Sequence, residues 1–370
     1  MKKILIGLLS FTVALASISC SSDKDSDQDD GKPGGKSQVT LSVNTSEARG
    51  FNRMYDFLDY MGLDHSVVDK LPSAYRMRVR NMVYNEQGQL VHDKYTLYNS
   101  YNKLAADELE LEHGQYQVVS IADVVMVNET GDINLCYWNV KDSVSIGTAR
   151  IMSSGYNGGS RDVVSAAITD ITVGDGVNSY TIVPKPLGSL ILCLWRNIHD
   201  DSSIGEVCLM TKDWANSMRI ASGKYVTGYT TSDYYRWVHA MISPADFPKS
   251  INVYGFAFSL EAVDLQFAYV CFDKSGDSWR MSEMIKNIPS GEFYVSLCDL
   301  STVYESRPTC MFATAESILG SASGAPQLKS VRQRGVWGCA NGGVDAWQAD
   351  VSGNGTKSVA FRNMPRGSKR

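Results

Sequence analysis

The sequence predicts a mainly β protein built from two tandem Greek-key β-sandwich domains behind a signal segment and a flexible tether. Three observations predict this fold class. Short alternating apolar runs recur along most of the chain, and a similar glycine–aromatic strand start occurs in both halves. In addition, 370 residues exceed what one ordinary sandwich needs. The composition, 44% hydrophobic and 20% charged, is that of a globular chain.

Residues 1–19 are expected to form a signal peptide. Two lysines precede an apolar run, 4–18, that is too short for a comfortable membrane span. The run ends in SISC, which resembles a bacterial lipobox, although Ser17 stands where a lipobox usually carries leucine. In such a motif the thiol of the cysteine receives a diacylglycerol, so we expect Cys20 to be lipidated and to become the mature N-terminus. Two acyl chains suffice for stable anchoring. The alternative is a plain signal peptide followed by a chance cysteine.

Residues 20–37 are expected to be a disordered acidic tether, because they hold almost no apolar side chain. A calcium loop fits poorly: Gly31 falls one place late for a loop beginning at Asp25, and Lys36 stands where the bidentate Glu should be. An acidic run directly after a lipidated cysteine resembles the export signal of surface lipoproteins in Bacteroidales-type bacteria. That resemblance implies a lipid-anchored outer-membrane protein that faces the cell exterior.

The first sandwich is expected over residues 38–155. VTLSV (39–43) alternates as a strand does, and apolar side chains at helical spacing between Phe51 and Met61 predict one amphipathic helix with a packing face. The segment AYRMRVR (74–80) is typical of a half-buried strand with a basic outer face of three arginines. The turn NEQGQ then leads into LVHDKYTLY and predicts a hairpin.

Two distant segments share a pattern that predicts two domains of similar design. In LELEHGQYQVVSIAD and in IPSGEFYVSLCDL, a glycine (Gly114, Gly291) permits a tight turn. An aromatic residue two positions later (Tyr116, Phe293) is expected to fill a sandwich core.

A turn-rich stretch, SSGYNGGSRD, predicts the break between the halves. Short strands with intervening turns then predict a second Greek-key sandwich, of the transthyretin-like type, over residues 160–312. Residues 313–370 are expected to be a linker, SILGSASGAP, and a C-terminal extension that is either extra strands or a mobile tail.

No motif in the sequence identifies a catalytic chemistry, so we expect no enzyme, no cofactor and no metal site. The 5 histidines form no HExxH helix. The sequence has no nucleophile elbow and no phosphate loop. No pair of carboxylates stands out for glycoside hydrolysis, although distant partners remain an open alternative. The net charge of −5 provides no basic face for nucleic acid.

The cysteines and tryptophans offer few candidate sites. Eight cysteines occur, and no CxxC pair argues for a zinc ribbon or a redox dithiol. One or two disulfides are compatible with a location outside the cytoplasm. Trp337 and Trp347 are the best candidates for an exposed aromatic site that contacts glycans.

Several segments together resemble the fimbrillin-associated anchor subunits of Bacteroidales-type fimbriae, FimB-like. The resembling elements are Cys20 with its aspartate run, RVRNMVYNEQGQLV, LELEHGQYQVVSIAD, PKPLGSLI and NIPSGEFYVSLCDLS. Beyond Cys20 and its aspartates, the resemblance covers roughly 39–301. The resemblance implies a lipoprotein that tethers a fimbrial shaft to the outer membrane. It also implies that the protein accepts a donor strand from a shaft subunit.

Arg49 bears on which subunit this is. Arg49-Gly50 follows the first predicted strand, where a trypsin-like protease could cut in shaft-type fimbrillins and release that strand. An ordinary loop arginine is the favoured interpretation, and an uncut Arg49 suits an anchor. The competing functional class is a glycan-binding surface lipoprotein, and a secreted hydrolase is the third.

Overall fold

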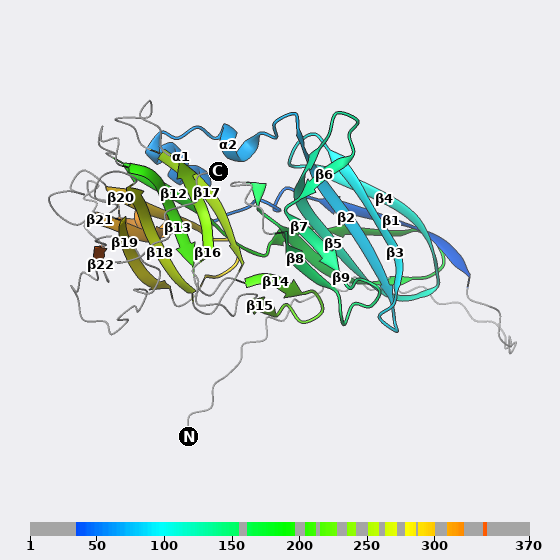
Figure 1. The fold of residues 1–370 in the computed structure, drawn as a ribbon. Coiled ribbons are helices and arrows are strands. Elements are labelled where there is room, and N and C mark those ends of the chain that lie inside the picture. The colour runs from blue at the N-terminus through cyan, green and yellow to red at the C-terminus, as the bar shows by residue number, and fades with distance from the viewer. Residues whose placement is uncertain are drawn as a thin grey trace, which may run out of the picture.

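The computed structural model describes residues 35–154, 161–196, 204–211, 215–227, 235–241, 251–258, 263–271, 278–285, 288–299, 309–321 and 336–338. Two β-sandwiches lie side by side, with a small sheet and short helices along their junction (Figure 1). The signal peptide, Cys20 and most of the tether lie outside the described residues. None of the helices within the described parts of the chain has the length and apolar character needed to cross a bilayer.

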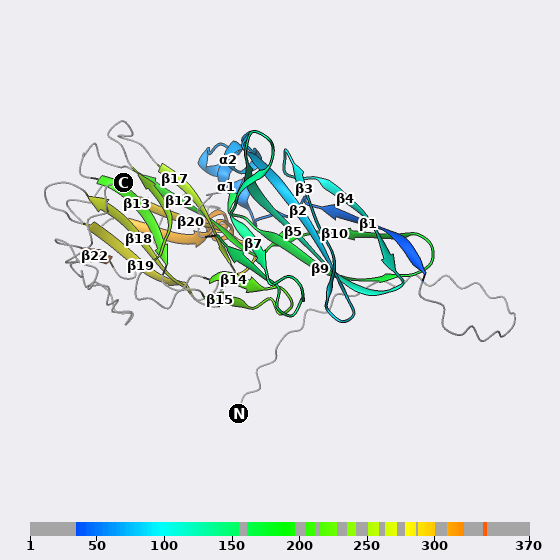
Figure 2. The ribbon, with the colours of Figure 1, turned by 45° about the vertical axis from the view of Figure 1, so that its right-hand side comes forward.

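The first sandwich pairs a three-stranded sheet with a larger one (Figure 2). The three-stranded sheet has the order β10 (Asn178–Ile182), β1 (Lys36–Asn44) and β4 (Leu104–Glu112). The larger sheet has the order β11 (Lys185–Pro186), β9 (Ser165–Val173), β5 (Gly114–Val127), β2 (Tyr75–Asn85) and β3 (Leu90–Tyr98), with β6 (Ile133–Cys136) paired to β5. Strand β1 therefore begins inside the segment that was expected to be tether.

The second sandwich also has two sheets. One has the order β17 (Ile251–Phe258), β12 (Gly188–Arg196), β20 (Phe293–Asp299) and β21 (Thr309–Thr314). The other has the order β16 (Tyr235–Met241), β13 (Ile204–Thr211), β18 (Val263–Cys271), β19 (Ser278–Ile285) and β22 (Val336–Gly338).

The two sandwiches repeat one strand order. In the first sandwich, a sheet with the order β4-β1-β10 faces a sheet with the order β3-β2-β5-β9. In the second sandwich, the equivalent strand orders are β17-β12-β20 and β16-β13-β18-β19. In both, the opening strand (β1 or β12) is parallel to one neighbour (β10 or β20) and antiparallel to the other (β4 or β17). The predicted mainly β architecture of two similarly built sandwiches is confirmed.

A separate small sheet, which belongs to neither sandwich, and three helices join the sandwiches. The sheet has the order β15 (Tyr225–Thr227), β14 (Ala215–Arg219), β8 (Arg150–Ser153) and β7 (Trp138–Lys141), so each half of the chain contributes strands. The helices are α1 (Met54–Met61), α2 (Ser66–Asp69) and α3 (Ala315–Ser321). The predicted helix near 51–61 is present, whereas α3 occupies a segment that was expected to be linker.

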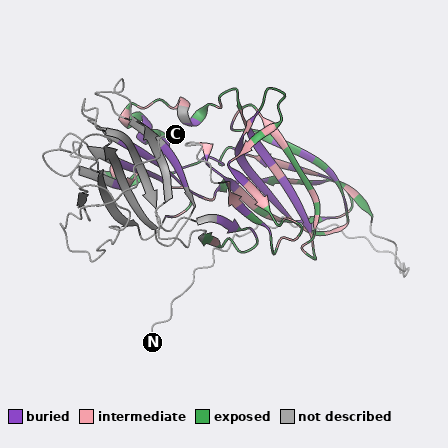
Figure 3. Cartoon of the chain, viewed as in Figure 1, coloured by how far each residue is buried: buried purple, intermediate pink, exposed green. Residues whose placement is uncertain are grey.

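One hydrophobic core runs across this junction. Phe57 of α1 packs on Phe293 of β20 with ring centroids 5.9 Å apart, and Trp138 of β7 meets Phe256 of β17 edge-on at 6.0 Å. Buried residues therefore continue from the first sandwich into the described part of the second (Figure 3). Of the two aromatic residues that were predicted to fill a core, Phe293 packs against α1 and Tyr116 packs against the core of the first sandwich.

The domain boundary expected between residues 155 and 160 does not match the sheets. Strands β9 and β10 follow that stretch, yet they pair with β5 and β1 and complete the first sandwich. Helix α1 precedes it, yet packs on β20 of the second sandwich. The turn-rich stretch marks the connection between β8 and β9, because turn residues indicate where a chain reverses and not which sheet it enters next.

Candidate functional site

Strand β1 is the central strand of its sheet, and its sequence explains why. Val39, Leu41 and Val43 alternate with polar residues and are 0% exposed, so one whole face of the strand enters the sandwich core. Both backbone edges are used: β1 pairs with β4 over Lys36–Asn44 and with β10 over Val39–Val43. The strand that follows the tether is thus held by two ladders and a core.

The segment after β1 is tied down on both sides of the junction. The Thr45 N–H donates to the Lys103 carbonyl at 2.9 Å, and the Lys103 N–H donates to Thr45 Oγ1 at 2.7 Å. The Ser165 hydroxyl donates to the Ala48 carbonyl. Further along, the Asn52 N–H donates to the Gly291 carbonyl of the second sandwich at 2.7 Å. Residues 45–52 therefore form a strap between the sandwiches.

Arg49 lies inside this strap. It is 9% exposed, and its guanidinium stacks over the ring of Tyr101 at 4.3 Å from the centroid. Burial lowers the pKa of Arg49, and Tyr101 opposes that shift. The next amide, Gly50 N–H, donates to the Glu47 carbonyl at 3.0 Å within a turn. A trypsin-like protease needs an exposed arginine in an extended segment, and neither condition holds here.

The edges of the first sandwich differ in how they are protected. On β4, Glu108, Glu110 and Glu112 alternate with buried residues and face solvent. Such a row of like charges discourages pairing with another acidic strand. On β3, Asp93 receives two hydrogen bonds from Arg80 at 2.7 and 2.6 Å. Strand β10, with the sequence NSYTI, carries no charged residue.

A buried carboxylate holds β4 against the opposite sheet. Asp107 is 5% exposed and accepts hydrogen bonds from His92 Nε2 at 2.9 Å and from Lys94 Nζ at 2.7 Å. Asn81 Nδ2 lies 3.4 Å away, and Ser120 Oγ donates to the Asn81 amide oxygen at 2.7 Å. Burial would raise the pKa of Asp107, but the hydrogen bonds from His92, Lys94 and Asn81 lower it to about 2.

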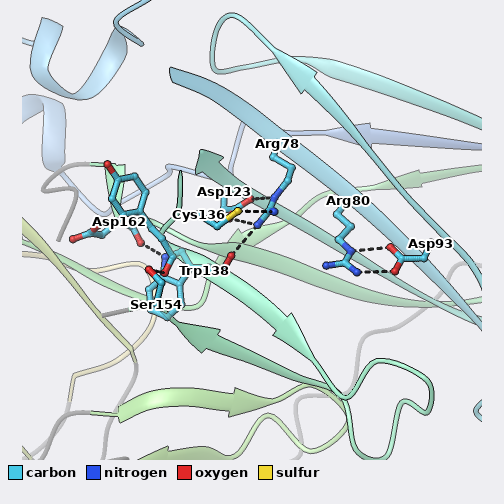
Figure 4. A network of polar contacts seen from close by, with 9 residues as sticks. Arg78, Arg80, Asp93, Asp123, Cys136, Trp138, Ser154 and Asp162 are labelled. Atoms are coloured by element: carbon cyan, nitrogen blue, oxygen red, sulfur yellow. Dashed lines mark hydrogen bonds and ion pairs between the residues drawn. The ribbon is translucent and has the colours of Figure 1, made fainter. Parts of the chain in front are cut away.

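A second polar network ties β2 to the small sheet (Figure 4). The Arg78 guanidinium donates to both carboxylate oxygens of Asp123, at 2.8 and 2.7 Å, and to the Trp138 carbonyl at 2.9 Å. Its Nη1 also lies 3.3 Å from Cys136 Sγ. Burial would lower the pKa of Arg78, but the charge and hydrogen bonds of Asp123 raise it above its usual range.

The expectation that Arg78 belongs to a basic outer face is therefore wrong. Alternation places Arg78 on the outer side of the larger sheet, as predicted, but β7 covers that side and Arg78 is buried. The neighbouring Arg80 does reach the surface and pairs with Asp93. The pairing of Arg78 with Asp123, 45 positions later, was missed because alternation alone does not reveal what covers a sheet.

The predicted site residues do not come together. Arg49 lies in the strap of the first sandwich, whereas Trp337 lies in β22, opposite Arg280 on β19 of the second. Cys20 and Trp347 lie outside the described residues, so lipidation and glycan contact stay predictions. Among the described residues, no group of three or more His, Cys, Asp or Glu side chains could hold a metal ion.

No protein-family model matches the chain, and no curated protein matches it. Among solved structures, the chain is similar to a candidate adhesin from Bacteroides thetaiotaomicron, with a TM-score of 0.42, 10% identity, and coverage of 76% of this chain and 97% of that one. It is similar to a fimbrial assembly protein from Parabacteroides distasonis, with a TM-score of 0.36, 11% identity and coverage of 76% and 97%.

A third similar structure is a candidate polysaccharide-binding protein from Bacteroides thetaiotaomicron, with a TM-score of 0.37, 9% identity, and coverage of 71% of this chain and 93% of that one. All three TM-scores lie below 0.5, so these likenesses carry no conclusion about what this chain binds or assembles with.

Proposed function

We propose that this chain is a lipid-anchored surface subunit that tethers a fimbria-type assembly to the outer membrane and binds a neighbouring subunit by strand addition. The observation that supports the anchor role most is the burial of Arg49 in the strap after β1. Because the lipid is expected at Cys20, a cut after Arg49 would separate the lipid and β1 from the rest of the covalent chain. Burial of Arg49 keeps that chain continuous.

The geometry also suits a load-bearing link. The tether is expected to lead directly into β1, so a pull on the lipid acts along the strand and loads both ladders in shear. Many hydrogen bonds must then break together, and the buried Val39, Leu41 and Val43 must leave the core at the same time. A strand at the edge of a sheet would have one ladder fewer to resist the same pull.

Two observations support strand addition. The sequence resembles fimbrial anchor subunits, and one strand at a sheet edge carries no charged side chain. An extended segment of another chain can add to an exposed edge, where main-chain hydrogen bonds supply affinity and alternate side chains supply register. Strand β10 is such an edge within the described residues.

The proposal is tested by isolating the full chain from the outer membranes of cells that produce it naturally. The expected result is a chain that fractionates with the membrane and brings fimbrial subunits with it. The Cys20→Ala variant is expected to leave the membrane fraction, since the thiol that would carry the lipid is gone. A chain that stays in the membrane without Cys20, or that brings no fimbrial subunit, would contradict the proposal.

A further inference from the structure

The strand that lies parallel to the opening strand, β10 in the first sandwich and β20 in the second, has different neighbours in the two sandwiches. In the second sandwich, β20 pairs in parallel with β12 on one side and antiparallel with β21 on the other. In the first, β10 holds the equivalent place and pairs in parallel with β1. On its other side, none of the strands that the structure describes pairs with it. The position that β21 fills in one sandwich is therefore not filled by a described strand in the other.

The free edge of β10 lacks the features that normally prevent strand addition. Asn178–Ile182 contains no charged residue and no proline, and the β1–β10 register runs without a bulge. Ser179 and Thr181 are exposed, whereas Asn178 and Ile182 are buried, so the strand is half-buried as a normal ladder strand is. The preceding Val177 is 96% exposed and places an apolar side chain beside this edge.

The opposite edge of the same sheet provides an internal contrast. Strand β4 faces solvent with Glu108, Glu110 and Glu112, a pattern that opposes added strands. Among the strands that the structure describes at the edges of this sheet, only β10 has an uncharged sequence, and the equivalent strand β20 of the second sandwich is paired on its outer side with an antiparallel strand, β21.

We propose that the outer edge of β10 accepts an antiparallel strand from a neighbouring subunit, placed as β21 is placed beside β20, while β1 stays in position. This inference rests on the proposed function and names the acceptor strand for it. The partner segment is extended and uncharged, with apolar side chains at alternate positions that continue the buried face of Tyr180 and Ile182.

The tether of the same chain does not fit this description. Residues 21–34 consist of Ser, Asp, Lys, Gln, Gly and Pro, none of which provides an apolar face or favours a strand. An added strand at β10 also differs from exchange of β1. Exchange would require removal of three fully buried side chains and two ladders, whereas addition leaves the core intact.

The experiment places a photo-crosslinking amino acid at Ser179 of the full chain, in cells that assemble it, with a matched chain carrying the crosslinker at Ala106 on β4. Both positions are exposed and lie on opposite edges of one sheet. The expected result is a covalent adduct with a neighbouring subunit from position 179 and none from position 106. Equal adducts from both positions, or adducts from position 106 alone, would overturn the inference.

A second pair of variants tests the same edge by charge. Thr181→Lys is expected to lower the amount of co-purified neighbouring subunit by about tenfold or more, since a lysine on an edge strand opposes pairing. Ala106→Lys is expected to leave it unchanged, and both variants should unfold at the temperature of the unaltered chain. Full co-purification with Thr181→Lys would refute the β10 assignment while leaving the proposed function standing. Failure of the unaltered chain to bring any subunit would instead refute the proposed function itself.

Discussion

The two sandwiches of this chain have the same strand order, but their smaller sheets end differently. The second sandwich adds β21 beside β20, with pairing from Tyr294↔Thr314 to Asp299↔Thr309. Among the described strands, the smaller sheet of the first sandwich ends at β10, which has five residues. Each is otherwise built around a buried opening strand, β1 or β12. The difference teaches that a sandwich can have a fully packed core while one edge of its smaller sheet pairs with none of the described strands.

The Arg78–Asp123 pair gives the largest expected effect, because both side chains are buried. Its loss tests whether the first sandwich is a complete, stable unit without an added strand. Asp123→Asn leaves a buried guanidinium without its counter-charge, so we expect a loss of about 3–5 kcal/mol in the free energy of unfolding. The matched Asp93→Asn variant breaks the more exposed pair with Arg80 and is expected to cost about 1 kcal/mol or less. Denaturant titration of both variants measures this, and equal costs would contradict the account.

The two opening strands should respond alike to truncation. Leu41 on β1 and Leu192 on β12 are both 0% exposed, so Leu41→Ala and Leu192→Ala are each expected to cost about 2–5 kcal/mol. Leu104, 70% exposed at the start of β4, is the control, and Leu104→Ala should stay within about 0.5 kcal/mol. A cost for Leu41→Ala near that of the control would mean that β1 is loosely held and exchangeable.

A disulfide is expected to fasten the strand that closes the second sandwich. Cys298 on β20 and Cys310 on β21 are direct partners in an antiparallel pair, and such pairs have Cα atoms about 4.5–5.5 Å apart, within the range that a disulfide spans. Loss of this bond in Cys310→Ser is expected to cost about 2–4 kcal/mol.

Peptide mapping without reductant checks this prediction: one crosslinked peptide should contain both residues and be lighter by two hydrogens than its reduced halves. Two free thiols in the protein isolated from its natural host would contradict it. Strand β21 would then be held beside β20 by main-chain pairing without a covalent bond.

The smallest expected effect is an acid dependence of the first sandwich. The pKa of Asp107 is lowered to about 2, so its ionised form stabilises the fold above the ordinary carboxyl pKa. That contribution, about 1–2 kcal/mol, is lost as pH falls from about 4 towards 2. Denaturation midpoints between pH 2 and pH 6 should show this loss, and Asp107→Asn should flatten the curve. An unchanged slope in that variant would assign the acid dependence to other carboxyls.

Local patterns in the sequence predicted the strands and the helix of the first half well. Alternation located β1, β2 and β3, and helical spacing located α1, because these periodicities follow directly from which side chains are buried. The segment AESILGS, by contrast, was expected to be a linker and forms α3, where Ala315 is buried against the shared core. Small residues there hid a packing role that only tertiary contact reveals.

Long-range assignments could not be predicted in the same way. Which sheet β9 and β10 enter depends on pairing with strands far earlier in the chain, and the glycine-rich turn before them gave no sign of it. The burial of Arg49 and Arg78 depends on Tyr101, Asp123 and Trp138, which are distant in sequence. The open edge of β10 depends on the strand orders of the two sandwiches, which no local sequence pattern reveals.

Hydrogen–deuterium exchange on the free chain and on the chain assembled with its neighbouring subunit tests the central claim most directly, because it reports on β1 and β10 in one measurement. The account predicts that amides of Asn178–Ile182 exchange more slowly after assembly, while those of Lys36–Asn44 are equally protected in both states. Unchanged exchange at β10 together with altered exchange across β1 would show that the partner replaces the opening strand, and would contradict the account.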